Sequence, residues 1–198
     1  MNQKTAMKLF GLLGLLMLLS CGYADRHRNS SSCEQALVDS LEVRVQDSLF
    51  SNVHYSRSQL LEALTQTQDS LVYYRLLALY GKTFFVSSDF DSILYYNRRV
   101  KEFSRNASQS SESLQSPQWN DVLSDVYNIE GNVWMQLNRP DSAIIDYKKA
   151  YGYRLEGKKL HLLPDICINI ADAYLHRSDL AHTASYYRRA LFLCDSLN

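Results

Sequence analysis

The stretch that decides the fold runs from Tyr127 to Tyr151 and reads YNIEGNVWMQLNRPDSAIIDYKKAY. Small and aromatic residues alternate along it. Counted from the glycine, they follow at three, twelve, sixteen and nineteen residues, in the order Gly131, Trp134, Ala143, Tyr147 and Ala150. The turn at Asn138–Ser142 can end one helix and start another, because proline is tolerated in a first turn and Asp or Ser caps free N–H groups. The stretch therefore predicts two antiparallel helices that pack closely.

Gly131 lies inside a helical run, where glycine costs about 1 kcal/mol relative to alanine. We therefore expect the backbone of the second helix to approach closely at this point. The pattern also recurs downstream, where the same offsets hold Ala171, Tyr174, Thr183, Tyr187 and Ala190. Upstream, Gly81 and Phe84 match, but Ile93, Asn97 and Val100 replace the small and aromatic residues, so this copy is degenerate.

The matching glycine and alanine positions are 50 and 40 residues apart. A solvated, serine-rich loop over 104–118 would account for the longer spacing. One more helix pair is expected earlier, over Ala36–Leu49 and Leu60–Thr67, because Leu37, Leu41, Val45 and Leu49 stand close to helical spacing. The sequence thus predicts an all-α fold of about four antiparallel helix pairs over residues 35–198. The best repeats are 124–156 and 164–197, and the degenerate one is 74–105.

These spacings resemble the tetratricopeptide repeat (TPR), whose helix pairs stack into an α-solenoid that binds other molecules. The resemblance implies that the first helix of each pair lines a concave face. By register, that face would carry Arg75, Lys82, Phe85, Asn128, Asn132, Met135, Asp172, Leu175 and His176. Their mixed polarity suits a peptide or protein segment. The lysine–asparagine clamp of cytosolic co-chaperones is not reproduced, and Asp165 and Asp172 would repel a terminal carboxylate there.

The N-terminus is typical of a signal peptide. Lys4 and Lys8 give it a positive start, and the apolar run Leu9–Leu19 is too short to span a membrane comfortably. The run ends in LLSCG, which resembles the lipobox of bacterial lipoproteins with Cys21 as the acylated residue. The expected division is a signal peptide over 1–20, a tether over 21–34 and the repeat domain after it. The resemblance implies a membrane-anchored lipoprotein of the cell envelope, on the periplasmic side of the outer membrane.

Composition and charge narrow the classes of function. The chain has 21 Lys+Arg and 21 Asp+Glu, and removing the signal peptide with its two lysines leaves the mature charge near −2. No basic stripe appears, so nucleic-acid binding is not expected. The sequence has no zinc-protease signature, nucleophile elbow or phosphate-binding glycine loop. We therefore expect no enzymatic activity, and neither a cofactor nor a metal.

Two sequence features leave alternatives open. Cys167 and Cys194 stand near ends of the last helix pair that would meet, so either a disulfide or two free thiols fits. Asp-Ser followed by an aliphatic residue or alanine recurs at Ser40, Ser48, Ser70, Ser92, Ser142 and Ser196. This pattern resembles the acceptor for envelope O-glycosylation in Bacteroidota, but Asp-Ser is also a natural helix start.

The repeats and the lipobox together resemble the TPR lipoproteins of Bacteroidota. The leading interpretation is a non-enzymatic, lipid-anchored protein–protein interaction module with a protein or peptide partner. One alternative is the sensor part of a truncated TPR transcriptional regulator, and another is a glycan-binding lipoprotein of an uptake system. The helical periodicity runs to Leu197, so we also expect an apolar C-terminal end face, including Tyr186 or Leu197, that self-association or a partner would cover.

Overall fold

The structure is a computed structural model of the 198-residue chain, and it describes residues 36–45, 51–107 and 116–197. The described residues form helices and turns, with no strand among them. A first helical segment covers residues 36–45. The elements that follow are α2 (Val53–Gln66), α3 (Ser70–Lys82), the 3₁₀ helix η1 (Thr83–Ser87), α4 (Phe90–Ala107), α5 (Pro117–Gln136), α6 (Pro140–Leu155), the 3₁₀ helix η3 (Leu160–Leu162), α7 (Leu163–His176) and α8 (Leu180–Leu197). The predicted all-α class is confirmed.

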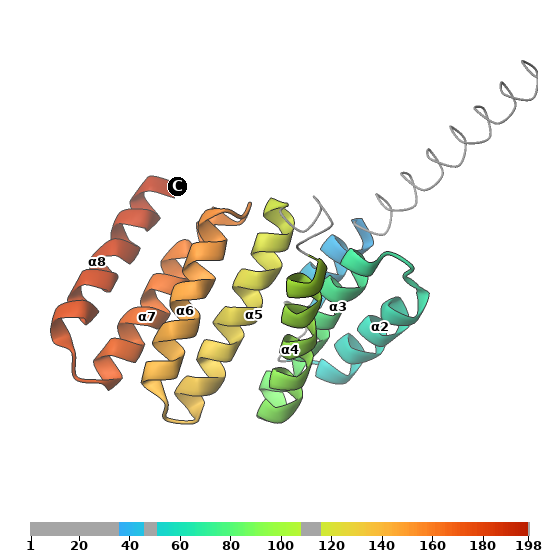
Figure 1. The fold of residues 1–198 in the computed structure, drawn as a ribbon, viewed down its shortest axis with the longest axis horizontal. Helices are drawn as coiled ribbons and strands as arrows, with labels where there is room; N and C mark the ends of the chain where they lie inside the picture. The colour runs from blue at the N-terminus through green and yellow to red at the C-terminus, as the bar shows by residue number, and fades with distance from the viewer. Residues whose placement is uncertain (1–35, 46–50, 108–115, 198) are drawn as a thin grey trace, which may run out of the picture.

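The helices stand side by side in a row from α2 to α8, and neighbours along the chain run antiparallel (Figure 1). The pairs α5–α6, α7–α8 and α3–α4 pack along their lengths, and α6 also packs on α7. Alternate helices meet as well, α3 against α5 and α5 against α7. The helices of each pair therefore lie in two layers, one of which is formed by the 36–45 segment, α3, α5 and α7.

Three turns repeat the same backbone geometry. Each contains one non-glycine residue in the left-handed conformation: Ser88 (φ 53°), Asn138 (φ 55°) and Ser178 (φ 62°). The N–H of the following residue then donates to the carbonyl five residues back, in the pairs Asp89–Phe84 (3.2 Å), Arg139–Trp134 (2.8 Å) and Asp179–Tyr174 (2.9 Å). These bonds satisfy carbonyls that a helix end leaves free. The turns are 50 and 40 residues apart, the spacing that the sequence predicts for the repeats.

Side-chain caps start most of the helices. Asn52, Asp69 and Ser116 accept bonds from backbone N–H groups at the starts of α2, α3 and α5. Asp89 does so for Ser92 in α4 (3.1 Å), and Asp179 for His182 in α8 (3.2 Å). The pKa of both carboxyl groups is lowered. The hydrogen bond from the Ser92 side chain is the main cause at Asp89, and the bond from the backbone N–H of His182 is the main cause at Asp179.

The positions that match between repeats are buried where the helices meet. Three sets of equivalent positions hold buried residues, which are Gly81, Gly131 and Ala171, then Ile93, Ala143 and Thr183, then Val100, Ala150 and Ala190. At Gly131 the close approach comes from the Tyr147 side chain, because a Cβ there would fall inside that ring. At Gly81 a Cβ would lie 2.9 Å from Tyr96 Cβ. The glycines thus make room for aromatic side chains of the second helix.

Some boundaries differ from the sequence prediction. The second helix was expected from Leu60, but α2 begins at Val53, where Asn52 caps it. The residues of its first turns are mainly polar, so they show no apolar periodicity from which this part of the helix could be predicted. The loop expected over 104–118 is shorter, since α4 continues to Ala107 and α5 begins at Pro117 with Ser116 as its cap. The signal peptide, Cys21, the tether and Cys33 lie outside the described residues. No helix in the described part is long and apolar enough to cross a membrane.

Candidate functional site

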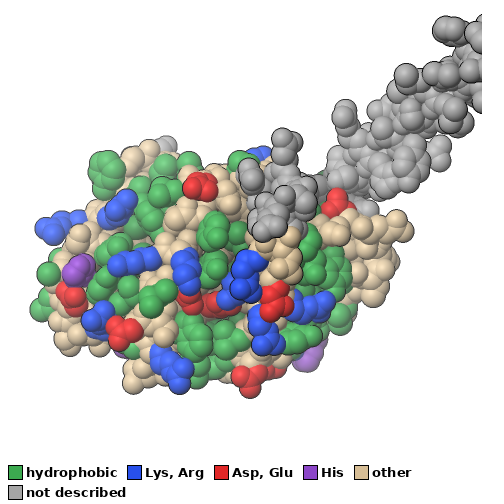
Figure 2. Space-filling view, in the orientation of Figure 1, with side chains coloured by type: hydrophobic (Ala, Val, Ile, Leu, Met, Phe, Trp, Pro, Cys, Tyr) green, Lys and Arg blue, Asp and Glu red, His purple; other side chains and the backbone are tan. Residues whose placement is uncertain are grey.

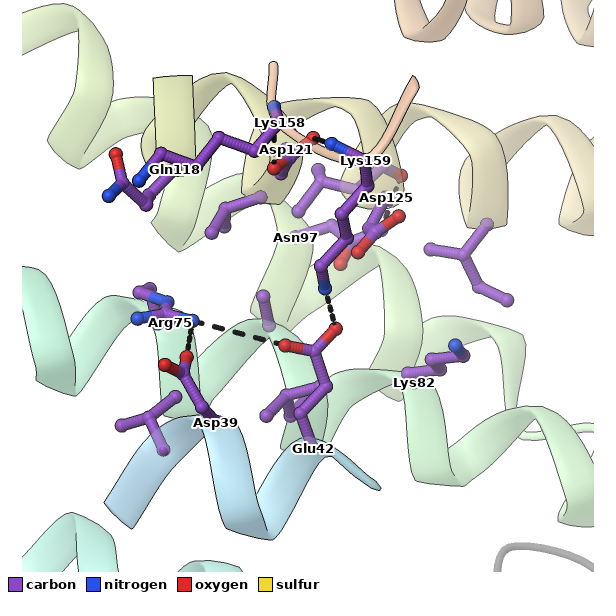
Figure 3. Close-up of a pocket in the computed structure, with 16 residues that line it drawn as sticks. Asp39, Glu42, Arg75, Lys82, Asn97, Gln118, Asp121, Asp125, Lys158 and Lys159 are labelled. Atoms are coloured by element: carbon purple, nitrogen blue, oxygen red, sulfur yellow. Dashed lines mark hydrogen bonds and ion pairs between the residues drawn. The ribbon is translucent and has the colours of Figure 1, made fainter. Parts of the chain in front are cut away.

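A cavity of about 280 Å³ lies between the 36–45 segment, α3, α4, α5 and the loop before η3. Its lining combines apolar side chains, which we call the floor, with polar and charged ones, which we call the walls and which are labelled in Figure 3. The apolar part comprises Val38, Ala78, Leu79, Val122, Val126 and Ile129. Polar side chains come from Asp39, Glu42, Arg75, Lys82, Asn97, Gln118, Asp121, Asp125, Lys158 and Lys159. An apolar floor with a few converging polar groups is the usual makeup of a ligand site.

Arg75 forms one wall of the cavity. It projects from α3, and its side chain is only 8% exposed. Its Nη2 lies 2.8 Å from Asp39 Oδ1 and 3.9 Å from Glu42 Oε2, both on the 36–45 segment. Its Nη1 is buried and has no hydrogen-bond partner among the residues that the structure describes. Half of the terminal guanidinium fork is therefore unused.

The opposite wall is held by a buried ion cluster. Arg154 of α6 is 2% exposed and donates to Asp121 of α5 at 2.7 Å and to Asp125 one turn later. Asp121 also accepts from the backbone N–H groups of Lys158 (3.0 Å) and Lys159 (3.2 Å). A Cβ at Gly157 would collide with the Asp121 carboxylate, so this loop conformation depends on glycine. The cluster thus fixes the α6–η3 loop beside the cavity.

The Lys159 side chain extends from that loop across the cavity to Glu42 (Figure 3). Its ion pair with Glu42 joins positions 117 residues apart in the chain. The bridge therefore ties the first helical segment to the region between the third and fourth helix pairs. Any ligand that enters the cavity must fit beside this bridge.

The charges lining the cavity are not equally satisfied. The four carboxylates, Asp39, Glu42, Asp121 and Asp125, each meet a lysine or arginine. Among the residues that the structure describes, no ion pair or hydrogen bond involves the ammonium groups of Lys82 and Lys158. The amide of Asn97 donates to the Val126 carbonyl at 3.1 Å, while its buried Oδ1 has no partner within the described segments. The charged groups of the cavity that still lack a partner in the described part of the chain are therefore mainly cationic.

The residues predicted for the concave face separate into three groups, two of which line cavities. Arg75 and Lys82 line the cavity just described. A second hollow, between α5, α6 and α7, is lined by Met135, Tyr147, Asn169, Asp172, Leu175 and His176. Leu175 and His176 are exposed there. Four of the predicted residues thus gather at this second hollow, in the layer of first helices.

The other predicted residues are engaged in packing or hydrogen bonds. Phe85 packs in the apolar cluster with Ile93 and Ile129. Asn128 accepts from Asn169 at 3.0 Å, and Asn132 accepts from the Tyr147 hydroxyl at 2.7 Å. Asp172, at the second hollow, likewise accepts from the Tyr187 hydroxyl, and this bond raises the pKa of Tyr187.

Sequence reasoning missed most of the charged cavity wall. The carboxylates of Asp121 and Asp125 are four residues apart on α5, a spacing that places them on one helix face. That spacing was the available signal for a shared cation. The Glu42–Lys159 pair has no local signal, because nothing within either segment indicates a partner so far along the chain.

A third region, between α4 and α6, gathers basic and aromatic side chains. Basic side chains are visible across the middle of the face in Figure 2, where these helices lie in Figure 1. Tyr127 and Tyr153 stack with centroids 5.6 Å apart, and Lys101 and Lys149 lie 5.2 and 5.0 Å from the Tyr127 centroid. Lys101 pairs with Glu130 at 2.7 Å, although burial still raises the Glu130 pKa. Lys101 and Lys149 therefore pack on the aromatic rings of this region and need no ligand to explain their presence.

Metal ligands and thiols were the other candidate reactive groups in the described part of the chain. No group of three or more His, Cys, Asp and Glu side chains there could hold a metal ion. Cys167 is buried and Cys194 is exposed, and both are free thiols. Burial raises the pKa of the Cys167 thiol. Of the two arrangements left open for these cysteines, the structure has the unpaired one, with Cys194 accessible.

Comparison with known proteins gives no family and a distant likeness to solved structures. No family model and no curated protein matches the chain. Among solved structures, the crystal structure of BtubC (BKLC) from P. vanneervenii aligns over 81% of this chain and 80% of that one, with 14% identity and a TM-score of 0.42. A likeness at this level carries no inference about binding.

Proposed function

We propose that the chain is a TPR-type α-solenoid that serves as a non-enzymatic protein–protein interaction module. The observation that carries the proposal is the repeated turn. The same left-handed residue and the same backbone bond recur at Ser88, Asn138 and Ser178, in step with the buried positions of the repeat. A solenoid of such pairs presents one continuous layer of first helices, and repeat proteins use such layers to bind extended segments.

The binding surface in this proposal is the hollow between α5, α6 and α7. It combines the exposed side chains of Leu175 and His176 with the half-buried Met135. Methionine adapts its shape to different partners, and exposed apolar groups next to polar ones suit a peptide. Among the described residues, none of these three side chains forms a hydrogen bond or an ion pair, and Met135 is half-buried against the neighbouring apolar cluster, so their exposed parts are available to a partner.

The test is partner capture from an envelope extract with the triple variant Met135→Ala/Leu175→Ala/His176→Ala. A matched control, Ile145→Ala/Leu191→Ala/His54→Ala, removes three exposed side chains of similar type elsewhere. We expect the first variant to lose the proteins that wild type captures and the control to retain them, with both equally helical by circular dichroism. Equal capture by both variants would refute binding at this hollow.

We further propose that the module is anchored through a lipid on Cys21, facing the periplasm from the outer membrane. The support is the sequence of the N-terminus, with its positive start, short apolar run and LLSCG motif. More than one acyl chain would anchor the protein stably. The variant Cys21→Ala should move the protein from the membrane fraction to the soluble fraction. A variant that stays with the membrane would exclude anchoring through this cysteine.

A further inference from the structure

The cavity beside Arg75 contains a buried guanidinium that is only half used. An arginine fork presents parallel donors that a carboxylate can accept with both of its oxygens. Here Nη2 of Arg75 donates to one oxygen of Asp39, whereas Nη1 has no partner in the described part of the chain. A buried donor without an acceptor costs stability. The site therefore gains from any acceptor that engages both nitrogens.

Asp39 is a weak occupant of this position. Its side chain is 65% exposed, whereas that of Arg75 is 8% exposed. An ion pair with one partner largely in water contributes little. A competing carboxylate can therefore replace Asp39 at Nη2 while Asp39 returns to solvent. Lys82 and Lys158, which have no ion pair among the described residues, add positive charge at the same cavity.

Size and enclosure favour a small molecule over a peptide. The volume of about 280 Å³ is near the lower end for ligand pockets. The Lys159–Glu42 bridge crosses the cavity and obstructs a chain that would continue through it. The floor of Leu79, Val122 and Ile129 is apolar. A fitting ligand is thus short, apolar at one end and anionic at the other.

We propose that this cavity binds a small organic acid, with one carboxylate on a compact aliphatic or aromatic body. The carboxylate takes both terminal nitrogens of Arg75 in place of Asp39, and the apolar body lies on the floor from α3 and α5. This site is separate from the hollow near Leu175 and goes beyond the proposed protein-binding role. The repulsive Asp165 and Asp172 do not line it.

The test is calorimetric titration of the full chain in detergent with 4-methylpentanoate and benzoate, each beside its uncharged amide. The acids should bind at least about tenfold more tightly than the amides, because the bonds to Arg75 are charge-assisted. Ala78→Leu fills the cavity without changing its charge, and it should abolish binding. It also serves as the blank for any uptake of the acids by detergent.

Three variants separate the proposed contact from general electrostatics. Asp39→Asn removes the competing carboxylate and should tighten binding of the acids several-fold, a gain that a purely structural Arg75–Asp39 pair would not produce. Arg75→Lys keeps the charge but loses the fork, and it should weaken binding about tenfold. The control Arg98→Met removes an exposed cation outside the cavity and should leave affinity unchanged.

Several results would overturn the proposal. These are equal affinity for acid and amide, weaker binding by Asp39→Asn, unchanged binding by Ala78→Leu, or no binding of either acid to folded wild type. Tighter binding of acetyl-Ala-Ala-Leu with a free carboxyl end than of either small acid would assign the cavity to a peptide terminus instead. If Arg75→Lys does not fold, as judged by circular dichroism, Asp39→Asn and Ala78→Leu decide the question.

Discussion

The central pair α5–α6 and the last pair α7–α8 share one design but differ in their surroundings. Equivalent residues are 40 positions apart, and both pairs use the same turn. Helix α5 is buried along much of its length, whereas α8 buries Thr183 and Ala190 and exposes large apolar side chains. The exposed ones are Leu180, Tyr187, Leu191, Phe192 and Leu197. The same repeat thus becomes core where helices flank it on both sides and amphipathic surface where they do not.

The two pairs also differ in polar chemistry. Arg154 in α6 is buried between two aspartates of α5. The residue 40 positions later is Cys194, which is exposed. The small residues of the repeat allow close helix packing in both pairs. The ionic cluster occurs in the central pair, where it fixes a loop beside the cavity.

The largest effect should come from removing the central cation. Arg154→Met leaves Asp121 buried without its partner, and breaking such a pair typically costs about 3–5 kcal/mol of unfolding free energy. Urea denaturation would measure the loss. The equivalent change in the last pair, Cys194→Ser, should stay within about 0.5 kcal/mol because that side chain is exposed. A cost below about 1 kcal/mol for Arg154→Met would show that the cluster does not stabilise the fold.

Overpacking the helix contact should have the next largest effect. Ala143 is fully buried between α5 and α6, so Ala143→Leu should cost about 1–3 kcal/mol. The control Ala184→Leu adds the same atoms to an exposed position of α8 and should change stability by less than about 0.5 kcal/mol. Thermal melting of both variants gives the comparison. An unchanged melting temperature for Ala143→Leu would contradict the assigned register.

A tyrosine hydroxyl offers a finer comparison at equivalent positions. Tyr147 is 2% exposed and donates to Asn132, and Tyr187 is 36% exposed and donates to Asp172. Tyr147→Phe should cost about 1–2 kcal/mol, because the half-buried Asn132 loses the donor that a buried tyrosine supplies, while Tyr187→Phe should be nearly neutral since water replaces the bond. Chemical denaturation of the two variants is the measurement. Equal costs would mean that burial does not distinguish the pairs.

The sequence predicted the repeated features because they are local. The small residues, the turns and their spacing depend on neighbours within one helix pair, so the periodicity from Gly131 to Ala150 contains them. It did not predict that the Tyr147 ring, rather than the backbone of α6, fills the space over Gly131. A pattern of small and large residues predicts that a helix contact needs space at the glycine. Which atoms fill that space depends on how the side chains pack.

The cavity was harder to predict, because its walls come from segments far apart in the chain. Arg75 and Lys82 were expected on the concave layer from the register alone. Their partner carboxylates on the 36–45 segment, and the Lys159 bridge, depend on how the pairs are stacked. Stacking angles are set by side-chain packing between pairs, and a single sequence gives no measure of them.

The smallest expected effect concerns how the two pairs start their second helices. Helix α6 follows Arg139 and has no side-chain cap, whereas Asp179 caps α8 and has a lowered pKa, mainly through the backbone N–H of His182. A carboxyl whose folded pKa lies below its unfolded value contributes stability above the unfolded pKa and loses it as pH falls through the folded pKa. The start of α8 should therefore loosen as pH drops below about 4.

Amide protection factors at the start of α8, corrected for the intrinsic pH dependence of exchange, would measure this loosening. Asp179→Asn keeps a good cap that does not titrate, so its protection should be slightly lower than wild type at pH 6 and should fall less in acid. The start of α6, which has no such carboxylate cap, provides the reference within the same molecule. An acid-induced loss of equal size in Asp179→Asn would assign it to other groups and remove this distinction between the two pairs.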